Sequence, residues 1–71
     1  MPSAAQQEIL QKLASLVELA PGIRAGQLLA HLDFLAQDMF DRALGEIEDD
    51  QLLLVLQRHE AELSRRKSNV A

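Results

Sequence analysis

The sequence predicts an all-α fold: a compact three-helix bundle with a short extra helical turn between the second and third helices. Three observations predict it. Apolar residues make up 48% of the 71 positions and are mostly Leu and Ala, the composition of a helical globular domain. They recur at spacings of three and four, whereas no segment alternates as a strand would. A Pro-Gly pair and an acidic segment divide the chain where helices would meet.

The first predicted helix covers residues 4–19. Ser3 is a good N-cap, and Gln6 three residues later completes a capping box. Pro21 and Gly22 then end the helix and turn the chain. One stripe about 120° wide carries the apolar residues of this helix: Ile9, Leu10, Leu13, Leu16, Val17 and Ala20.

The second predicted helix starts near Ile23 and reaches Gln37 or beyond. A second, partly apolar face carries Gly26, Ala30 and Phe34 at spacing i, i+4, i+8, so we expect this helix to be contacted on two sides. It is then either the central element of the fold or a subunit interface. The main apolar stripe consists of Ala25, Leu28, Leu29, Leu32, Leu35, Ala36 and Met39.

Residues 38–47 are predicted as a loop with a short helical turn, held to the core by Phe40 and Leu44 and ended by Gly45. The third helix covers about 49–66, with Glu48 as N-cap and Gln51 at the third position. Its apolar stripe consists of Leu52, Val55, Leu56, His59 and Leu63. Leu53 and Leu54 point away from this stripe, which predicts a second neighbour for them.

These helices form a single domain over residues 1–67, followed by a frayed tail at 68–71. The chain has no cysteine, which excludes disulfides and thiol chemistry and is consistent with a reducing compartment. No apolar run approaches the ~18 residues that span a bilayer. The start of the chain lacks the basic region of a secretory signal, so we expect a cytoplasmic protein without membrane contact.

The net charge of −4 is unevenly distributed. Residues 33–50 hold seven acidic side chains against Arg42, whereas residues 51–71 carry a net +2. An acidic middle repels phosphate backbones, which makes nucleic acid an unfavoured partner. A helix-turn-helix reader is unfavoured for the same reason. The basic cluster at the end of the chain consists of Arg65, Arg66 and Lys67.

A polar strip follows the second helix: Arg24, Gln27, His31 and Asp38. It has two interpretations. In the first, it is a binding site in which a cation and an amide bind a carboxylate or a partner's backbone. In the second, it is a solvated strip in which Arg24 pairs with acidic residues near 46–50. The second interpretation is favoured, and Arg24 and Gln27 are the best functional candidates within the strip.

The sequence contains no catalytic motif, and we expect neither enzyme activity nor a cofactor. His31 and His59 are the only candidate metal ligands of the imidazole type, but they lie on different helices with no second His or Cys four residues away. We therefore expect no metal, and His59 is interpreted as a partly buried core histidine. The acidic middle also fails the calcium-loop pattern, because Phe40 and Arg42 occupy ligand positions if the loop starts at Asp38.

Two elements carry a resemblance: Arg24-Ala25-Gly26-Gln27-Leu28-Leu29 and, about twenty residues later, Ile47-Glu48-Asp49-Asp50-Gln51-Leu52. Over residues 21–58 the chain resembles a family of small bacterial proteins of unknown function that share these elements in this order. The resemblance implies a bacterial origin and no particular activity. It also suggests that Arg24 and Gln27 lie near Glu48 and Asp49 in the fold.

The leading functional hypothesis is a non-enzymatic protein–protein interaction module that self-associates, as a homodimer or within a larger assembly. Its expected surface consists of Gly26, Ala30, Phe34, Leu53 and Leu54, which exceed what a lone bundle of this size can hide. The alternative is a small nucleic-acid or regulatory adaptor that uses the C-terminal basic cluster. A third hypothesis is a small-molecule or metal site around His31 and Arg24.

Overall fold

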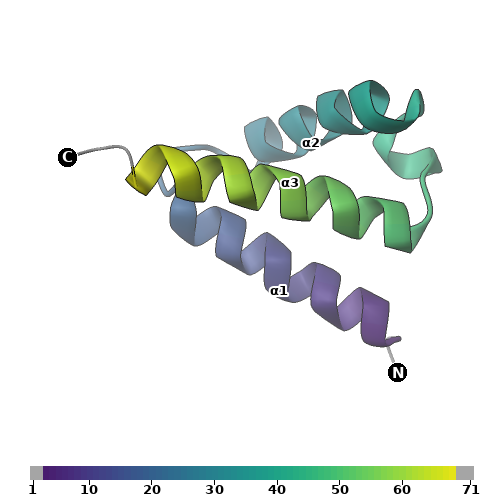
Figure 1. Cartoon of the computed structure of the whole chain (residues 1–71), viewed down its shortest axis with the longest axis horizontal. Helices are drawn as coiled ribbons and strands as arrows, with labels where there is room; N and C mark the ends of the chain where they lie inside the picture. Colours follow the sequence, from purple (N-terminus) through teal and green to yellow (C-terminus); the bar gives the residue numbers. More distant parts are fainter. Residues whose placement is uncertain (1–2, 69–71) are drawn as a thin grey trace.

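The computed structural model describes the backbone of residues 3–68 and the side chains of residues 3–66. Its described part is all-α, with three helices and one short 3-10 turn between the second and third, as predicted. Figure 1 shows α3 running between α1 and α2, antiparallel to α2. The elements are α1 (Ala4–Leu19), α2 (Ala25–Phe40), η1 (Leu44–Glu46) and α3 (Asp49–Ser68).

The predicted capping box starts α1. The Ser3 hydroxyl accepts a hydrogen bond from the Gln6 N–H, and the Ser3 N–H donates to Gln6 Oε1, both at 3.1 Å. These bonds satisfy two backbone donors that a helix start otherwise leaves without partners.

The second helix begins two residues after the predicted start and ends at Phe40, beyond Gln37 as predicted. Arg24, in an extended conformation, precedes it, and its N–H donates to Gln27 Oε1 at 3.0 Å. Asp41 ends the helix in the left-handed region, at φ 57°, and its N–H donates to the Gln37 carbonyl. Asp41 thus supplies the left-handed residue that glycine usually provides at a helix end. The prediction that Gly45 ends the short turn is wrong, because η1 covers Leu44–Glu46 and Gly45 lies inside it.

The connection to α3 is held by side-chain hydrogen bonds. Asp33 accepts from the Leu44 N–H at 2.7 Å and from the Gln37 side-chain amide at 2.9 Å, which fixes η1 against α2. The Glu48 N–H then donates to Gln51 Oε1 at 3.0 Å, as the predicted cap requires. Helix α3 continues to Ser68, two residues beyond the predicted end, and the rest of the predicted tail lies outside the described residues.

The core lies around α3. Leu16 of α1, Leu32 of α2 and both Val55 and Leu56 of α3 are the largest fully buried side chains. The expectation that the second helix is central is therefore wrong. Helix α3 packs against both others, whereas α1 and α2 make little contact with each other.

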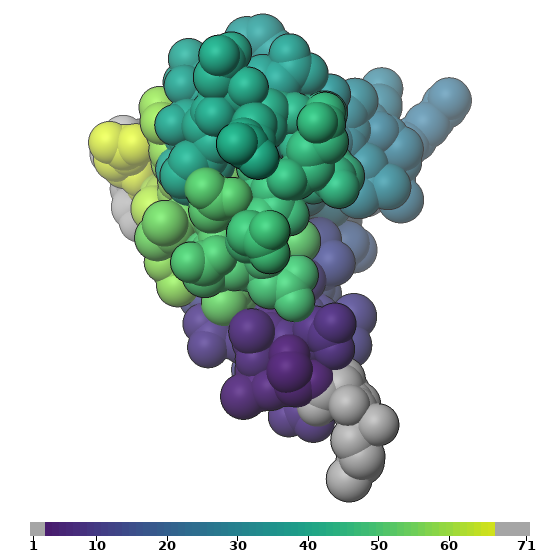
Figure 2. Space-filling model, turned by 90° about the vertical axis from the view of Figure 1, so that its right-hand side faces the viewer, coloured from purple at the N-terminus to yellow at the C-terminus, as the bar shows by residue number. Residues whose placement is uncertain are grey.

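This arrangement leaves part of two predicted apolar stripes uncovered. Leu10 and Val17 of α1 are 62% and 54% exposed, and Leu29 of α2 is 50% exposed, although all three were predicted to face the core. In a closed bundle α1 and α2 would cover one another's flanks. Here α2 lies above α3 and α1 below it (Figure 2), so each outer helix is covered mainly by α3.

An ion pair reinforces the packing of α1 on α3. The Lys12 ammonium lies 2.8 Å from the Glu60 carboxylate, and both side chains are about three-quarters buried. None of the helices described here has the length and apolar character needed to cross a membrane.

Candidate functional site

The polar strip predicted along α2 is divided in the structure. Gln27 and His31 line a pocket near the start of the helix, whereas Asp38 lies 3.8 Å from the Arg58 guanidinium of α3. Arg24 precedes α2 and is exposed. The strip is thus not one site: its middle faces the end of α3 and its far end joins a surface ion pair.

The expected pairing of Arg24 with acidic residues near 46–50 is wrong, and so is the expected proximity of Arg24 and Gln27 to Glu48 and Asp49. Helices α2 and α3 run antiparallel, so the start of α2 lies beside the end of α3 (Figure 1). Arg66 lines the same pocket as Gln27, whereas Glu48 and Asp49 lie at the opposite end of α3. The 16 residues of α2 separate these ends by about 24 Å.

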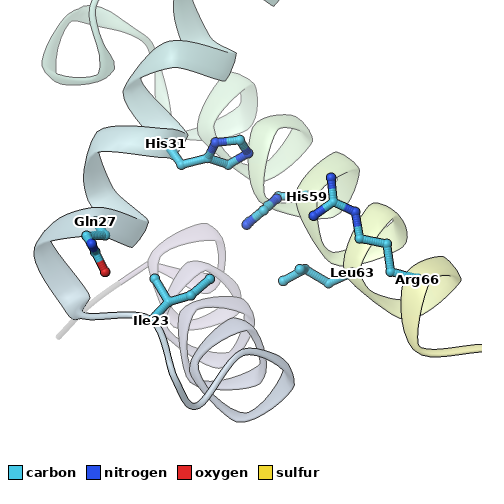
Figure 3. Close-up of a pocket in the computed structure, with 6 residues that line it drawn as sticks. All are labelled: Ile23, Gln27, His31, His59, Leu63 and Arg66. Atoms are coloured by element: carbon cyan, nitrogen blue, oxygen red, sulfur yellow. The ribbon is translucent and has the colours of Figure 1, made fainter. Parts of the chain in front are cut away.

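The pocket holds a pair of histidines. The rings of His31 and His59 have their centroids 4.5 Å apart and are tilted by 49°. Figure 3 shows both side chains projecting from neighbouring helices into the space between them. The open pocket has a volume of about 320 Å³ and is lined by Ile23, Gln27, His31, His59, Leu63 and Arg66.

His59 is the one polar residue among the buried residues of the described chain. It is 5% exposed, which confirms its interpretation as a core histidine. Its Nδ1 atom is buried and has no hydrogen-bond partner among the described residues. A buried polar atom without a partner costs about 1–3 kcal/mol, so the fold carries a penalty at this position.

The surroundings of His59 favour its neutral form. Burial lowers the pKa of the imidazole, and repulsion from His31 and Arg66 lowers it further, while Glu62 acts in the opposite direction. Since only an unprotonated imidazole nitrogen can bind a metal or accept a proton, the environment keeps His59 in the form that can do either.

Glu62 completes a cluster with the two histidines. One potential ligand atom from each of His31, His59 and Glu62 lies within 4.8 Å of the others. Glu62 Oε1 also lies 3.5 Å from Arg58 Nε. Glu62 was not among the candidate ligands predicted from the sequence, although it lies three residues after His59 and thus on the same side of α3. The missing information was the packing that brings His31 of α2 beside them.

Four of the five residues expected to form an interaction surface are exposed, and the fifth is partly buried. Gly26, Ala30 and Phe34 are all exposed on α2, and Phe34 is 68% exposed. Leu54 of α3 is also exposed, but the expectation for Leu53 is wrong. Leu53 packs against the core, because α3 has helices on two sides and its second neighbour lies within the same chain.

The basic cluster at the end of the chain is only partly described. Arg65 and Arg66 are exposed on the last turns of α3, and the side chain of Lys67 lies outside the described residues.

Comparisons of the chain with models of protein families, with curated proteins and with solved structures found no match. The resemblance to a bacterial family therefore stays a prediction.

Proposed function

We propose that this protein is a non-enzymatic protein–protein interaction module that forms a homodimer through the outer face of α2. The surface consists of Gly26, Ala30 and Phe34 and is called the α2 outer stripe below. Its support is the exposure of Phe34, which at 68% is the most exposed of the large apolar side chains. Such a ring on a small helical protein gains free energy when a partner covers it.

Gly26 supports the same surface independently. Gly26 is the second residue of α2, and glycine costs a helix up to about 1 kcal/mol relative to alanine. Nothing within the described chain requires a glycine here: a Cβ atom at position 26 would meet no atom within 4 Å, and the backbone does not have a positive φ. A partner helix that approaches closely would require it.

The spacing of the stripe favours a second copy as that partner. Phe34 and Gly26 lie four residues either side of Ala30. If two α2 helices pair antiparallel about a two-fold axis at Ala30, each Phe34 lies over the other copy's Gly26, where no side chain occupies the space. The two Ala30 residues then meet at the centre, as in an isologous interface.

The charges of α2 are compatible with this arrangement. Arg24 precedes the helix, whereas Asp38 and Asp41 lie in or directly after its last turn. Antiparallel pairing brings the cationic end of one copy near the acidic end of the other and aligns the two helix dipoles favourably. A parallel pair would instead place like charges together.

The test is sedimentation of the wild type and two variants at micromolar concentrations. We expect a concentration-dependent dimer for the wild type and for Leu54→Glu, the matched control, which changes an exposed leucine outside the stripe. Phe34→Glu should stay monomeric with unchanged helix content. A strictly monomeric wild type, or a Phe34→Glu variant that still dimerises, would contradict the proposal.

A second candidate is a nucleic-acid or regulatory adaptor, supported by the exposed Arg65 and Arg66. It predicts retention on DNA or RNA that falls with rising salt and is lost when both arginines become alanine. The net charge of −4 disfavours it relative to the dimer.

A further inference from the structure

We propose that His31, His59 and Glu62 form a binding site for a divalent transition metal ion of the zinc class. This inference is independent of the proposed dimer, because all three residues belong to one chain. It revises the expectation of no metal, which was based on the two histidines lying on different helices with no second His or Cys four residues from either.

The donor set is that of a zinc site with an open position. Two imidazole nitrogens and one carboxylate oxygen are the protein ligands of many zinc centres in which water or substrate takes the fourth place. Tetrahedral bonds of 2.0–2.1 Å require ligand atoms about 3.3 Å apart. The three atoms here lie within 4.8 Å of one another, so modest side-chain rotations close the gap.

The burial of the three side chains is compatible with the rotations that would bring their ligand atoms together. His31 is exposed and Glu62 is only partly buried, so both can rotate toward an ion, whereas His59 is held in the core as a fixed ligand. The contact with Arg58 involves Glu62 Oε1 and leaves Oε2 available. Arg58 then acts as a positioning residue that orients the carboxylate.

Three features of His59 point to a ligand rather than to packing alone. Its Nδ1 atom has no partner although it is buried, its ring faces His31, and the site opens into the 320 Å³ pocket through which an ion can enter. A leucine at this position would fill the same space in the core and would leave no buried nitrogen without a hydrogen-bond partner.

Two arginines place positive charge near the proposed site: Arg58, which contacts Glu62, and Arg66. Arg66 lines the pocket on the α3 side, beside His59 (Figure 3), and its charge repels a metal ion. If the site binds metal, Arg66→Gln should tighten the binding, because it removes this repulsion without removing a ligand.

The experiment uses the full chain without a histidine tag. Since the sequence holds two histidines and no cysteine, no other imidazole and no thiolate competes for a zinc-class ion. Zn²⁺ binding is measured by calorimetry and by the shift in melting temperature, and Co²⁺ binding by its absorption bands. Mg²⁺ is the negative control, because it prefers oxygen ligands and octahedral geometry.

We expect one Zn²⁺ ion per chain and a higher melting temperature with Zn²⁺ but not with Mg²⁺. His31→Ala and Glu62→Gln should weaken Zn²⁺ binding by more than about tenfold, since even loss of an outer-shell partner costs 10–100-fold. Glu8→Gln, a change of an exposed glutamate on α1, should leave it unchanged. His59→Leu should abolish binding and yet raise the melting temperature of the metal-free protein.

Several outcomes would overturn the proposal: no binding of Zn²⁺ or Co²⁺, binding that His31→Ala and Glu62→Gln leave intact, or one ion per two chains. The measurement is repeated on Phe34→Glu, which separates the two proposals. Zinc binding by this monomeric variant supports the site whether or not the wild type dimerises.

Discussion

Gly26 and His59 are two residues whose identities are not explained by packing within the described part of the chain. A Cβ atom at position 26 has free space around it, and the imidazole at position 59 is buried with one nitrogen unsatisfied. Both choices lower the stability of the single chain. Residues that cost stability without a structural reason are candidates for function, and these two support the dimer and the metal site respectively.

Gly26→Ala should raise the free energy of unfolding of the monomer by up to about 1 kcal/mol, because alanine is the better helix former and its methyl group contacts nothing. Denaturant unfolding measures this best in the Phe34→Glu background, where dimer formation does not contribute. No change or a loss of stability there would mean that the backbone at position 26 needs glycine after all.

Glu60 is expected to give the protein a pH-dependent increment of stability. The hydrogen bond from Lys12, aided by Ser15, lowers the pKa of its carboxyl below the usual value of 4.5. A lowered carboxyl pKa stabilises the fold above the unfolded-state value, and this stabilisation is lost as the pH falls through the folded-state value.

Glu60→Gln should therefore lower the free energy of unfolding at pH 7 by no more than about 1 kcal/mol, as is usual for a partly exposed ion pair. Urea unfolding of both proteins from pH 7 down to pH 3 measures the difference, which should shrink below about pH 4.5. A difference that stays constant over this range would show that the charge of Glu60 does not contribute.

At the scale of the elements, the covered side of each outer helix is narrower than its apolar stripe. On α1, Leu16 is fully buried against α3, whereas Leu10 is 62% exposed. Both belong to the stripe that the sequence predicts to face the core. The difference arises because α1 packs against one helix and not against two.

A matched pair of substitutions on α1 compares how much the buried Leu16 and the exposed Leu10 contribute to the free energy of unfolding. Leu16→Ala removes a fully buried side chain and should cost about 2–5 kcal/mol, a large part of the stability of a domain this small. Leu10→Ala should change the free energy of unfolding by less than about 0.5 kcal/mol. Equal effects in thermal or urea unfolding would contradict the packing described here.

At the scale of the whole molecule, the open arrangement of the helices leaves a large apolar surface. Among the side chains of residues 3–66, six large apolar ones are at least 45% exposed, and the buried core contains only eight apolar residues. Burial is limited in any chain of this size, and an open bundle limits it further. Association with a partner is one of the ways in which such a small domain gains stability.

The melting temperature of the wild type should consequently rise with protein concentration, because a dimer is stabilised by mass action. Phe34→Glu should melt at the same temperature at every concentration. Scanning calorimetry over a hundredfold range of concentration provides the comparison. If both proteins behave alike, association through the α2 outer stripe contributes nothing to stability.

The local features of the fold were predictable from the sequence. The Ser3–Gln6 box, the Glu48 cap and the short turn near Leu44 depend on residues within a few positions of one another, and the structure confirms all three. Helix periodicity likewise identified Leu16, Leu32 and Leu56 as buried residues. Capping and periodicity are local properties, so their physical causes are visible in the order of the residues.

Only the tertiary structure decided which helix is central and which residues meet. Periodicity shows which side of a helix is apolar but not which neighbour covers it, so Leu10 and Leu29 were expected inside and Leu53 outside. The meeting of His31 and His59, 28 positions apart in the chain, depends on the antiparallel packing of α2 on α3. Helix formation is governed by near neighbours, whereas the histidine cluster exists only where two helices pack at one particular register.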